Sequence, residues 1–160
     1  MRRPHVLALV GAGIVLFLVI SALLARAFSA DGAERSAVTD LVQAEAHGDL
    51  NAALGRVLHC GNDPTCRARV TANVAALKRP ASVSILQIEP STSFSLGSTL
   101  GTARVAFRIG DSHAIVQCVR VRRAGNVLSG LSIQLLSVTA PLKGTADCPA
   151  SYLTRINPEG

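Results

Sequence analysis

The sequence predicts an α+β domain behind an N-terminal transmembrane helix, with two or three helices packed on an antiparallel sheet of about four strands. Three observations lead to this expectation. Residues 6–25 contain no charge and no proline. From Glu34 to Leu77 apolar residues recur every three or four positions, and from Ser82 to Thr139 they alternate. Helices that precede an antiparallel sheet commonly cover one face of it.

The run Val6–Ala25 is long enough to cross a bilayer, since about 1.5 Å per residue gives roughly 30 Å. Arg2 and Arg3 precede it, so the positive-inside rule places residues 1–5 in the cytoplasm. A cleaved signal peptide is the alternative, because small residues at Ala25 and Ala27, or two positions later, suit a signal peptidase. Signal-peptide apolar regions are usually about 7–15 residues, so the longer run favours a retained anchor.

The rest of the chain is then extracytoplasmic, with about 125 residues left for one domain with its own core. The predicted organisation is a cytoplasmic tail at 1–5, a transmembrane signal anchor at 6–25, a stalk at 26–33, an α+β domain at 34–142 and a C-terminal tail at 143–160 that Cys148 pins.

Two helices with a sharp corner between them are predicted from Glu34 to about His59. The corner is His47-Gly48-Asp49. Gly48 suits the position just after a helix, and Asp49 suits the N-cap of the next one. The apolar stripe of these helices consists of Ala37, Val38, Leu41, Val42, Ala46, Leu50, Ala53, Leu54, Val57 and Leu58.

A third helix is predicted to begin at Pro64 or Thr65 and to end before Pro80, because proline is tolerated in the first turn but stops a helix from within. Its expected buried face consists of Cys66, Val70, Val74 and Leu77.

Four strands are predicted at 82–89, 102–109, 113–123 and 127–139. Tight turns at Gly110-Asp111-Ser112 and Ala124-Gly125-Asn126 join the last three. The side chains expected to face the helices are Val83, Ile85, Val105, Phe107, Ile115, Gln117, Val119, Val127, Leu131 and Ile133.

All four cysteines follow the apolar run, and an even number in an oxidising compartment predicts two disulfides. Three pairings are possible. We favour Cys60–Cys66, because the turn-rich CGNDPTC loop returns its own ends, and Cys118–Cys148, which pins the C-terminal tail. A four-cysteine zinc site is the alternative, but its ligands usually come in close pairs, which these spacings lack. No metal site or cofactor is expected.

The order of elements resembles the nuclear transport factor 2-like, or cystatin-like, cone fold. Helices with a Gly-Asp corner, within Ala44–Leu54, precede long antiparallel strands. The resemblance covers about Glu34 to Thr139 and implies a curved sheet. Mce-associated proteins of actinobacteria and inner-membrane scaffold subunits of type IV secretion systems share this layout behind one membrane helix. The secretion subunits generally have a longer cytoplasmic tail. The resemblance implies a non-enzymatic role, although the same cone hosts isomerases and dehydratases elsewhere.

Nucleic acid is not an expected partner. The net charge of +6 includes Arg2, Arg3 and Arg26, and the remaining thirteen basic residues face ten acidic ones. Four Phe, one Tyr and no Trp are scattered along the chain, without the basic patch and stacking aromatics of nucleic-acid binders. Fourteen arginines against two lysines are typical of a GC-rich bacterial genome.

No catalytic residue is predicted. Among the expected inner-face side chains only Gln117 is polar, and an amide does no acid–base chemistry. His47, His59 and His113 lie at the ends of predicted elements, where solvated histidines are common. The chain contains no nucleophile-elbow motif and no glycine-rich phosphate loop.

Two features are candidate contact surfaces. Arg104 and Arg108 share one face of their strand, as do Arg120 and Arg122, so these four could contact anionic lipid or an acidic partner. A solvated outer sheet face is the simpler interpretation. The segment 90–101, with Phe94 and Leu96, is read as an exposed loop, or as a strand extension with two contact points.

The sequence therefore predicts a membrane-anchored extracytoplasmic interaction domain, a non-catalytic scaffold or accessory subunit of a bacterial envelope complex with a protein partner. The alternative is a small hydrophobic ligand or lipid-binding domain that uses an open cone interior.

Overall fold

The computed structural model describes residues 3–91, 99–126, 130–144 and 146–149. It divides into two compact units, Met1–Gly32 and Ala33–Gly160. The predicted contact points Phe94 and Leu96, the inner-face residue Val127 and the tail beyond residue 149 lie outside the described residues.

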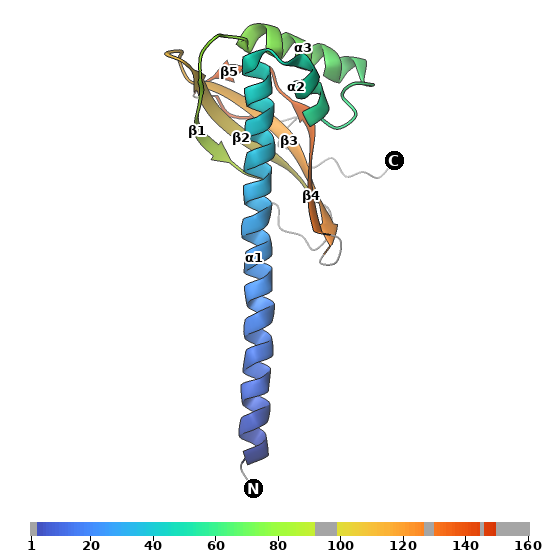
Figure 1. Cartoon of the computed structure of the whole chain (residues 1–160), viewed down its shortest axis with the longest axis vertical. Coiled ribbons are helices and arrows are strands. Elements are labelled where there is room, and N and C mark those ends of the chain that lie inside the picture. The colour runs from blue at the N-terminus through green and yellow to red at the C-terminus, as the bar shows by residue number, and fades with distance from the viewer. Residues whose placement is uncertain (1–2, 92–98, 127–129, 145, 150–160) are drawn as a thin grey trace. The chain divides into compact units, whose positions relative to one another are not determined.

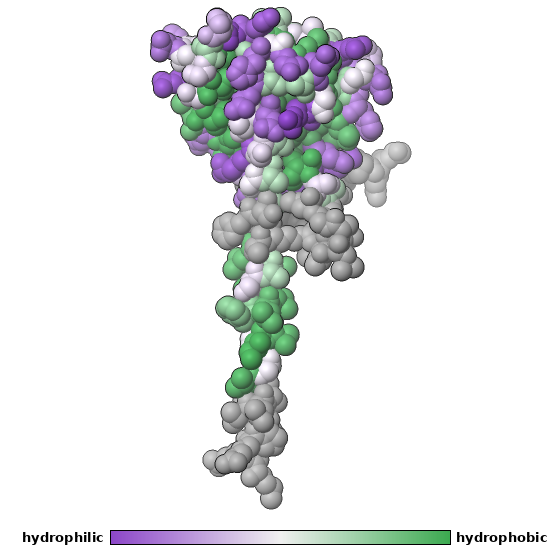
Figure 2. All heavy atoms as spheres, viewed as in Figure 1, coloured by the Kyte–Doolittle hydropathy of each residue, from purple (hydrophilic) through white to green (hydrophobic). Residues whose placement is uncertain are grey.

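The described part of the first unit, from Arg3, is helical and belongs to α1 (Arg3–His47). Its large apolar side chains are exposed, from 47% for Ile20 to 68% for Phe17, and they appear green in Figure 2. Within the described residues, no helix combines the length and apolar character needed to span a membrane. Residues 26–33, where a stalk was predicted, are helical and continue α1. This segment contains no proline to interrupt the helix.

In the second unit, the last turns of α1 meet α2 (Leu50–Arg56) at the predicted corner. Gly48 has φ +79°, the left-handed conformation that ends many helices. Asp49 is the N-cap, and its carboxylate accepts a hydrogen bond from the Ala52 backbone N–H at 2.9 Å. The helix–Gly-Asp–helix prediction is confirmed. However, α2 ends before Val57, which takes an extended conformation and bridges to Leu135 in the sheet.

The third helix, α3 (Pro64–Leu77), begins at the predicted proline. Asp63 caps it, since one carboxylate oxygen accepts from the N–H groups of Thr65 and Cys66 at 2.8 and 3.2 Å. Its predicted apolar face is confirmed. Val70, Val74 and Leu77 are buried, and Cys66 packs against the same core.

The strands are β1 (Val83–Glu89), β2 (Thr99–Ile109), β3 (Ile115–Asn126), β4 (Gly130–Val138) and β5 (Leu142–Lys143). The first four form an antiparallel sheet in chain order (Figure 1), and β5 pairs with the start of β3. β2 starts earlier than predicted, and β5 was not predicted because two residues carry no periodicity. The sheet is not strongly curled, so it differs from the curved sheet that the resemblance implied. Its register shifts are confined to Ile85/Gln87 and Arg120/Val121 in the described pairings.

The main core lies between the helices and one face of the sheet, where apolar side chains of α1, α2 and α3 meet those of the strands. The other sheet face is partly covered as well. Ala106, Val116 and Cys118 are buried there, and Leu142 and Cys148 pack against them. The strand alternation predicted an outer face here, either solvated or in contact with lipid or a partner. The covering segment is the C-terminal tail, held by the Cys118 disulfide.

Both favoured disulfides are present, Cys60–Cys66 with Cα atoms 5.2 Å apart and Cys118–Cys148 with Cα atoms 5.7 Å apart. Every cysteine is therefore paired and none remains as a thiolate ligand for zinc. Two disulfides indicate an oxidising, extracytoplasmic environment.

Candidate functional site

The interior of the α+β unit is the first place to look for a site. Val105, Phe107 and Val119, expected on the inner face, are 0% exposed. Ile115, Ile133, Val83 and Ile85 are half-buried and pack against the same core, while the Leu131 side chain lies outside the described part. Side chains thus fill the space between helices and sheet in which a cone would hold a ligand.

One polar cluster lies inside this core. It joins Glu45 of α1, Asn73 of α3 and Gln117 of β3, which are 0%, 1% and 0% exposed. The Asn73 amide donates to one Glu45 carboxyl oxygen at 3.1 Å and to the Thr139 carbonyl at 2.9 Å. The Gln117 amide donates to the other Glu45 oxygen at 2.7 Å. The cluster therefore ties two helices to the sheet through one carboxyl group.

Burial raises the pKa of Glu45 above its usual 4.5, although the hydrogen bonds from Gln117 and Asn73 act in the opposite direction. Within the described part of the chain, Asn73 Oδ1 and Gln117 Oε1 accept no hydrogen bond. A carboxyl with a raised pKa beside two amides resembles an acid–base site in composition. However, a reacting atom needs contact with solvent or substrate, and these three side chains are at most 1% exposed.

Sequence reasoning identified only Gln117 from this cluster. Glu45 lies four residues after Leu41, on the apolar stripe of its helix, so its position on that stripe was a usable signal. Asn73 lies three residues after Val70 and four before Leu77 on the buried face of α3, so its position carried the same signal.

A second buried carboxylate, Glu34, has an ionic partner. Its Oε2 lies 2.6 Å from Arg123 Nε and accepts from Ser91 Oγ at 2.9 Å, while its Oε1 accepts from the Ser91 N–H at 2.7 Å. The Glu34 side chain is 0% exposed and that of Arg123 12% exposed. Arg123 therefore belongs to the helix-facing side of the sheet and joins α1 to β3.

The four candidate arginines, Arg104, Arg108, Arg120 and Arg122, share the opposite sheet face. The pairing of Arg104 with Cys118 and of Thr102 with Arg120 fixes this common side. Arg104 is used within the fold, since it donates to the carbonyls of Ala146 and Gly144 at 3.2 and 3.5 Å. Arg108 is exposed, whereas Arg120 and Arg122 are half-buried. Part of the predicted basic surface thus holds the C-terminal tail.

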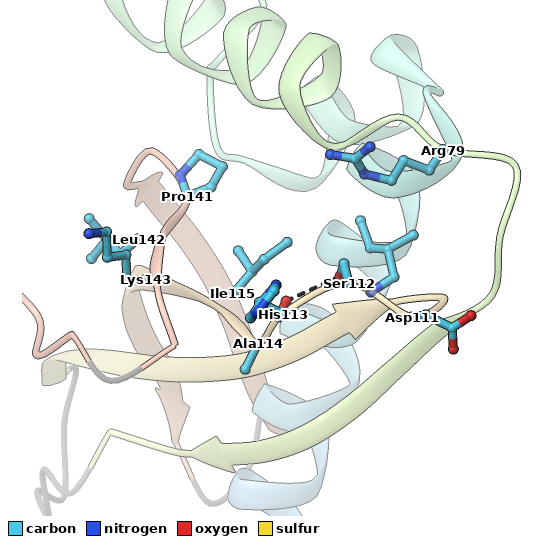
Figure 3. Close-up of a pocket in the computed structure, with 10 residues that line it drawn as sticks. Arg79, Asp111, Ser112, His113, Ala114, Ile115, Pro141, Leu142 and Lys143 are labelled. Atoms are coloured by element: carbon cyan, nitrogen blue, oxygen red, sulfur yellow. Dashed lines mark hydrogen bonds between the residues drawn. The ribbon is translucent and has the colours of Figure 1, made fainter.

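A pocket of about 660 Å³ opens at the end of the sheet beside the β2–β3 hairpin. We call it the rim pocket. Figure 3 shows Arg79, from the segment after α3, and Pro141 on opposite sides of its opening, with His113 and Ile115 between them. The lining residues are Arg79, Ile109, Asp111, Ser112, His113, Ala114, Ile115, Pro141, Leu142 and Lys143. Sequence analysis noted His113 and the hairpin turn but had no signal for a pocket.

The other histidines lie apart from this pocket. His47 ends α1, and His59 precedes the Cys60–Cys66 loop with φ +57°. Both are exposed. Among the described residues, no group of three or more histidine, cysteine, aspartate or glutamate side chains is arranged to hold a metal ion.

Within the described residues, these features give two buried polar groups that join helices to the sheet, one basic sheet face and one open pocket. Comparison of the chain with protein-family models, curated proteins and solved structures finds no match. The fold is α+β, and no family is identified.

Proposed function

We propose that this chain is a single-pass, membrane-anchored extracytoplasmic interaction domain, a non-catalytic scaffold or accessory subunit of a bacterial envelope complex. The observation that carries the proposal is the filled interior of the second unit, where Val105, Phe107 and Val119 are fully buried. Catalytic and ligand sites are usually open cavities with converging polar groups. A filled interior supports a role for the outer surface instead.

Two observations support the extracytoplasmic anchor at residues 6–25. Ten large apolar side chains between Val10 and Leu24 are exposed, and soluble monomers rarely expose a contiguous apolar patch above a few hundred Å². The two disulfides fit an oxidising compartment on the outer side.

The nuclear transport factor 2-like resemblance is part of this proposal. The Gly48–Asp49 corner and the helices that precede an antiparallel sheet support it. The modest curling of the sheet counts against a cone with an open mouth. The alternative function is a hydrophobic ligand or lipid bound in the cone interior. It has less support, because the inner-face side chains occupy that volume.

Membrane fractionation tests the anchor. We expect the full chain to remain in the membrane pellet after an alkaline carbonate wash. Val15→Arg with Leu18→Arg should release it, because a charge at the centre of a spanning helix costs about 2.5–3.5 kcal/mol. Leu86→Arg, at an exposed leucine of β1, is the matched control and should stay in the pellet. Wild-type protein in the wash supernatant would contradict the anchor.

Site-specific photo-crosslinking in native membranes tests the interaction surface. A photoreactive side chain at Arg108 or Arg122, on the basic sheet face, should give a discrete protein adduct. The same group at Arg69, exposed on α3, is the control and should give none. No adduct from the sheet face, or identical adducts from all three positions, would contradict a partner on that face.

A further inference from the structure

We propose that the rim pocket binds a carboxylate carried on a small apolar group. This goes beyond the proposed function, which concerns the anchor and the sheet face. At about 660 Å³ the pocket falls within the usual range for small-molecule sites, roughly 300–1,000 Å³. Unlike the Glu45 cluster, it is open to solvent.

The inner part of the pocket is apolar. Ile109 is buried at the pocket, and Ile115 and Pro141 are half-buried around it, whereas the Leu142 side chain packs against Val116 and Cys118 on the other sheet face. A ligand that covered these side chains would remove apolar surface from water, which favours binding by about 25 cal/mol per Å². An apolar group of roughly four to six carbons occupies only part of this volume but is large enough to contact several of these side chains.

The outer part carries more positive than negative charge. Arg79 and Lys143 are exposed cations, and Asp111 is the one carboxylate among the lining residues. In Figure 3 the Asp111 carboxylate points to the outer side of the hairpin turn, whereas Arg79 extends over the opening. A guanidinium offers two parallel N–H donors that match a carboxylate, so Arg79 is the residue best suited to select an acid.

The hairpin that forms the floor is held in place independently of any ligand. Ser112 Oγ accepts from the Ile109 N–H at 3.0 Å and donates to the His113 carbonyl at 3.1 Å. Ser112 therefore positions the turn. A preformed pocket requires little ordering when a ligand binds.

The recognised chemistry, an acid on an apolar stem, has two sources, a free organic acid or the C-terminus of a polypeptide that ends in an apolar residue. The probes 4-methylpentanoate and N-acetylleucine represent the two. Their amides, 4-methylpentanamide and N-acetylleucinamide, retain the apolar group and lose the charge. Acetate retains the charge and loses the apolar group.

Binding is measured on the full chain in a non-ionic detergent, with methyl-labelled isoleucine and leucine observed by NMR. We expect at least one acid to shift the Ile109 and Ile115 methyl signals saturably. Its amide and acetate should bind at least fivefold more weakly. Arg79→Gln should lower the affinity for the acid about fivefold, which is the effect of one solvent-exposed ion pair. Arg69→Gln, an exposed arginine on α3, should leave the affinity unchanged.

A fivefold tighter binding of one acid identifies the source of the ligand, a free organic acid or a polypeptide C-terminus. Equal affinities support only the chemistry that the two share, an acid on an apolar group. Amides that bind as tightly as the acids would overturn the proposal, as would shifts that avoid the pocket methyls. Lys143→Gln is the second variant, should Arg79→Gln fail to fold. If neither variant lowers the affinity for the acid, the pocket does not recognise the charge of the ligand. Because these readouts involve neither the membrane nor a partner, their failure would leave the proposed function standing.

Discussion

Two glutamates on the same helix have entirely buried side chains but different partners. Glu34 meets Arg123 and Ser91, so its charge has a counterion. Glu45 meets the amides of Asn73 and Gln117, and burial raises its pKa. An ion pair protects a buried carboxylate, whereas amides only partly offset the loss of hydration. Two residues of one type, eleven positions apart, thus hold the same helix to the sheet by different means.

The largest loss of stability is expected when Glu34 loses its cationic partner, Arg123. Arg123→Met should lower the free energy of unfolding by about 3–5 kcal/mol, because Glu34 would remain buried without a counterion. Chemical denaturation of the full chain in non-ionic detergent measures this. Adding Glu34→Gln should recover part of the loss. A loss below about 1 kcal/mol would mean that the pair contributes no more than a surface ion pair.

Loss of the Cys118–Cys148 disulfide should lower the free energy of unfolding by nearly as much. It should leave both carboxylate sites intact. Cys118→Ser opens a loop of sequence separation 30, for which the chain-entropy model gives about 3–4 kcal/mol. Thermal melting under non-reducing conditions should therefore occur at lower temperature. Melting equal to that of the parent would show that the Cys118–Cys148 bridge adds no stability.

A smaller effect is expected from crowding the Glu34 site. A Cβ atom added at Gly101 would lie 2.2 Å from the Ser91 Cβ atom, so Ser91 would have to move away from Glu34. Gly101→Ala should cost about 1–3 kcal/mol. Gly55→Ala, where a Cβ atom meets nothing within 4 Å, is the matched control on α2. The prediction fails if both variants have the same stability.

The smallest effect belongs to Glu45 and depends on pH. Its folded-state pKa is raised, so its stabilising contribution is complete below about pH 4.5 and is lost as the pH rises through the folded-state pKa. Relative to Glu45→Gln, the wild type should therefore lose stability between these two values, by at most about 1.4 kcal/mol per pH unit. Denaturation from pH 4 to pH 8 measures the difference. A difference independent of pH would contradict the raised pKa.

Local patterns predicted much of this fold. Gly48 and Asp49 marked the helix corner, Pro64 marked the start of α3, and the turn-rich loop predicted the first disulfide. Each of these signals lies within a few residues of the feature that it predicts. The alternation of β2 also predicted correctly that Val105 and Phe107 are buried.

The remaining features depend on residues far apart in the sequence. The Glu45–Gln117 and Glu34–Arg123 contacts span 72 and 89 positions, and no local period encodes them. Strand alternation does not show that the tail covers the second sheet face, so Arg104 was predicted to lie on an outer face that is solvated or contacts lipid or a partner. The rim pocket depends on how the segment after α3 meets β5, and the two residues of β5 carry no pattern.

The measurement that tests the filled interior most directly is a carbon-13 NMR titration of the Glu45 carboxyl in the full chain. A closed core around Asn73 and Gln117 predicts a midpoint above 4.5, because burial disfavours the charged form. The same carboxyl in Asn73→Ala, which removes one hydrogen bond to the charged form, should titrate higher still. A Glu45 midpoint at or below 4.5 in the wild type that Asn73→Ala does not raise would mean that water, and not the Asn73 amide, stabilises this carboxylate. The interior would then be open, and a ligand-binding role would replace the interaction role proposed here.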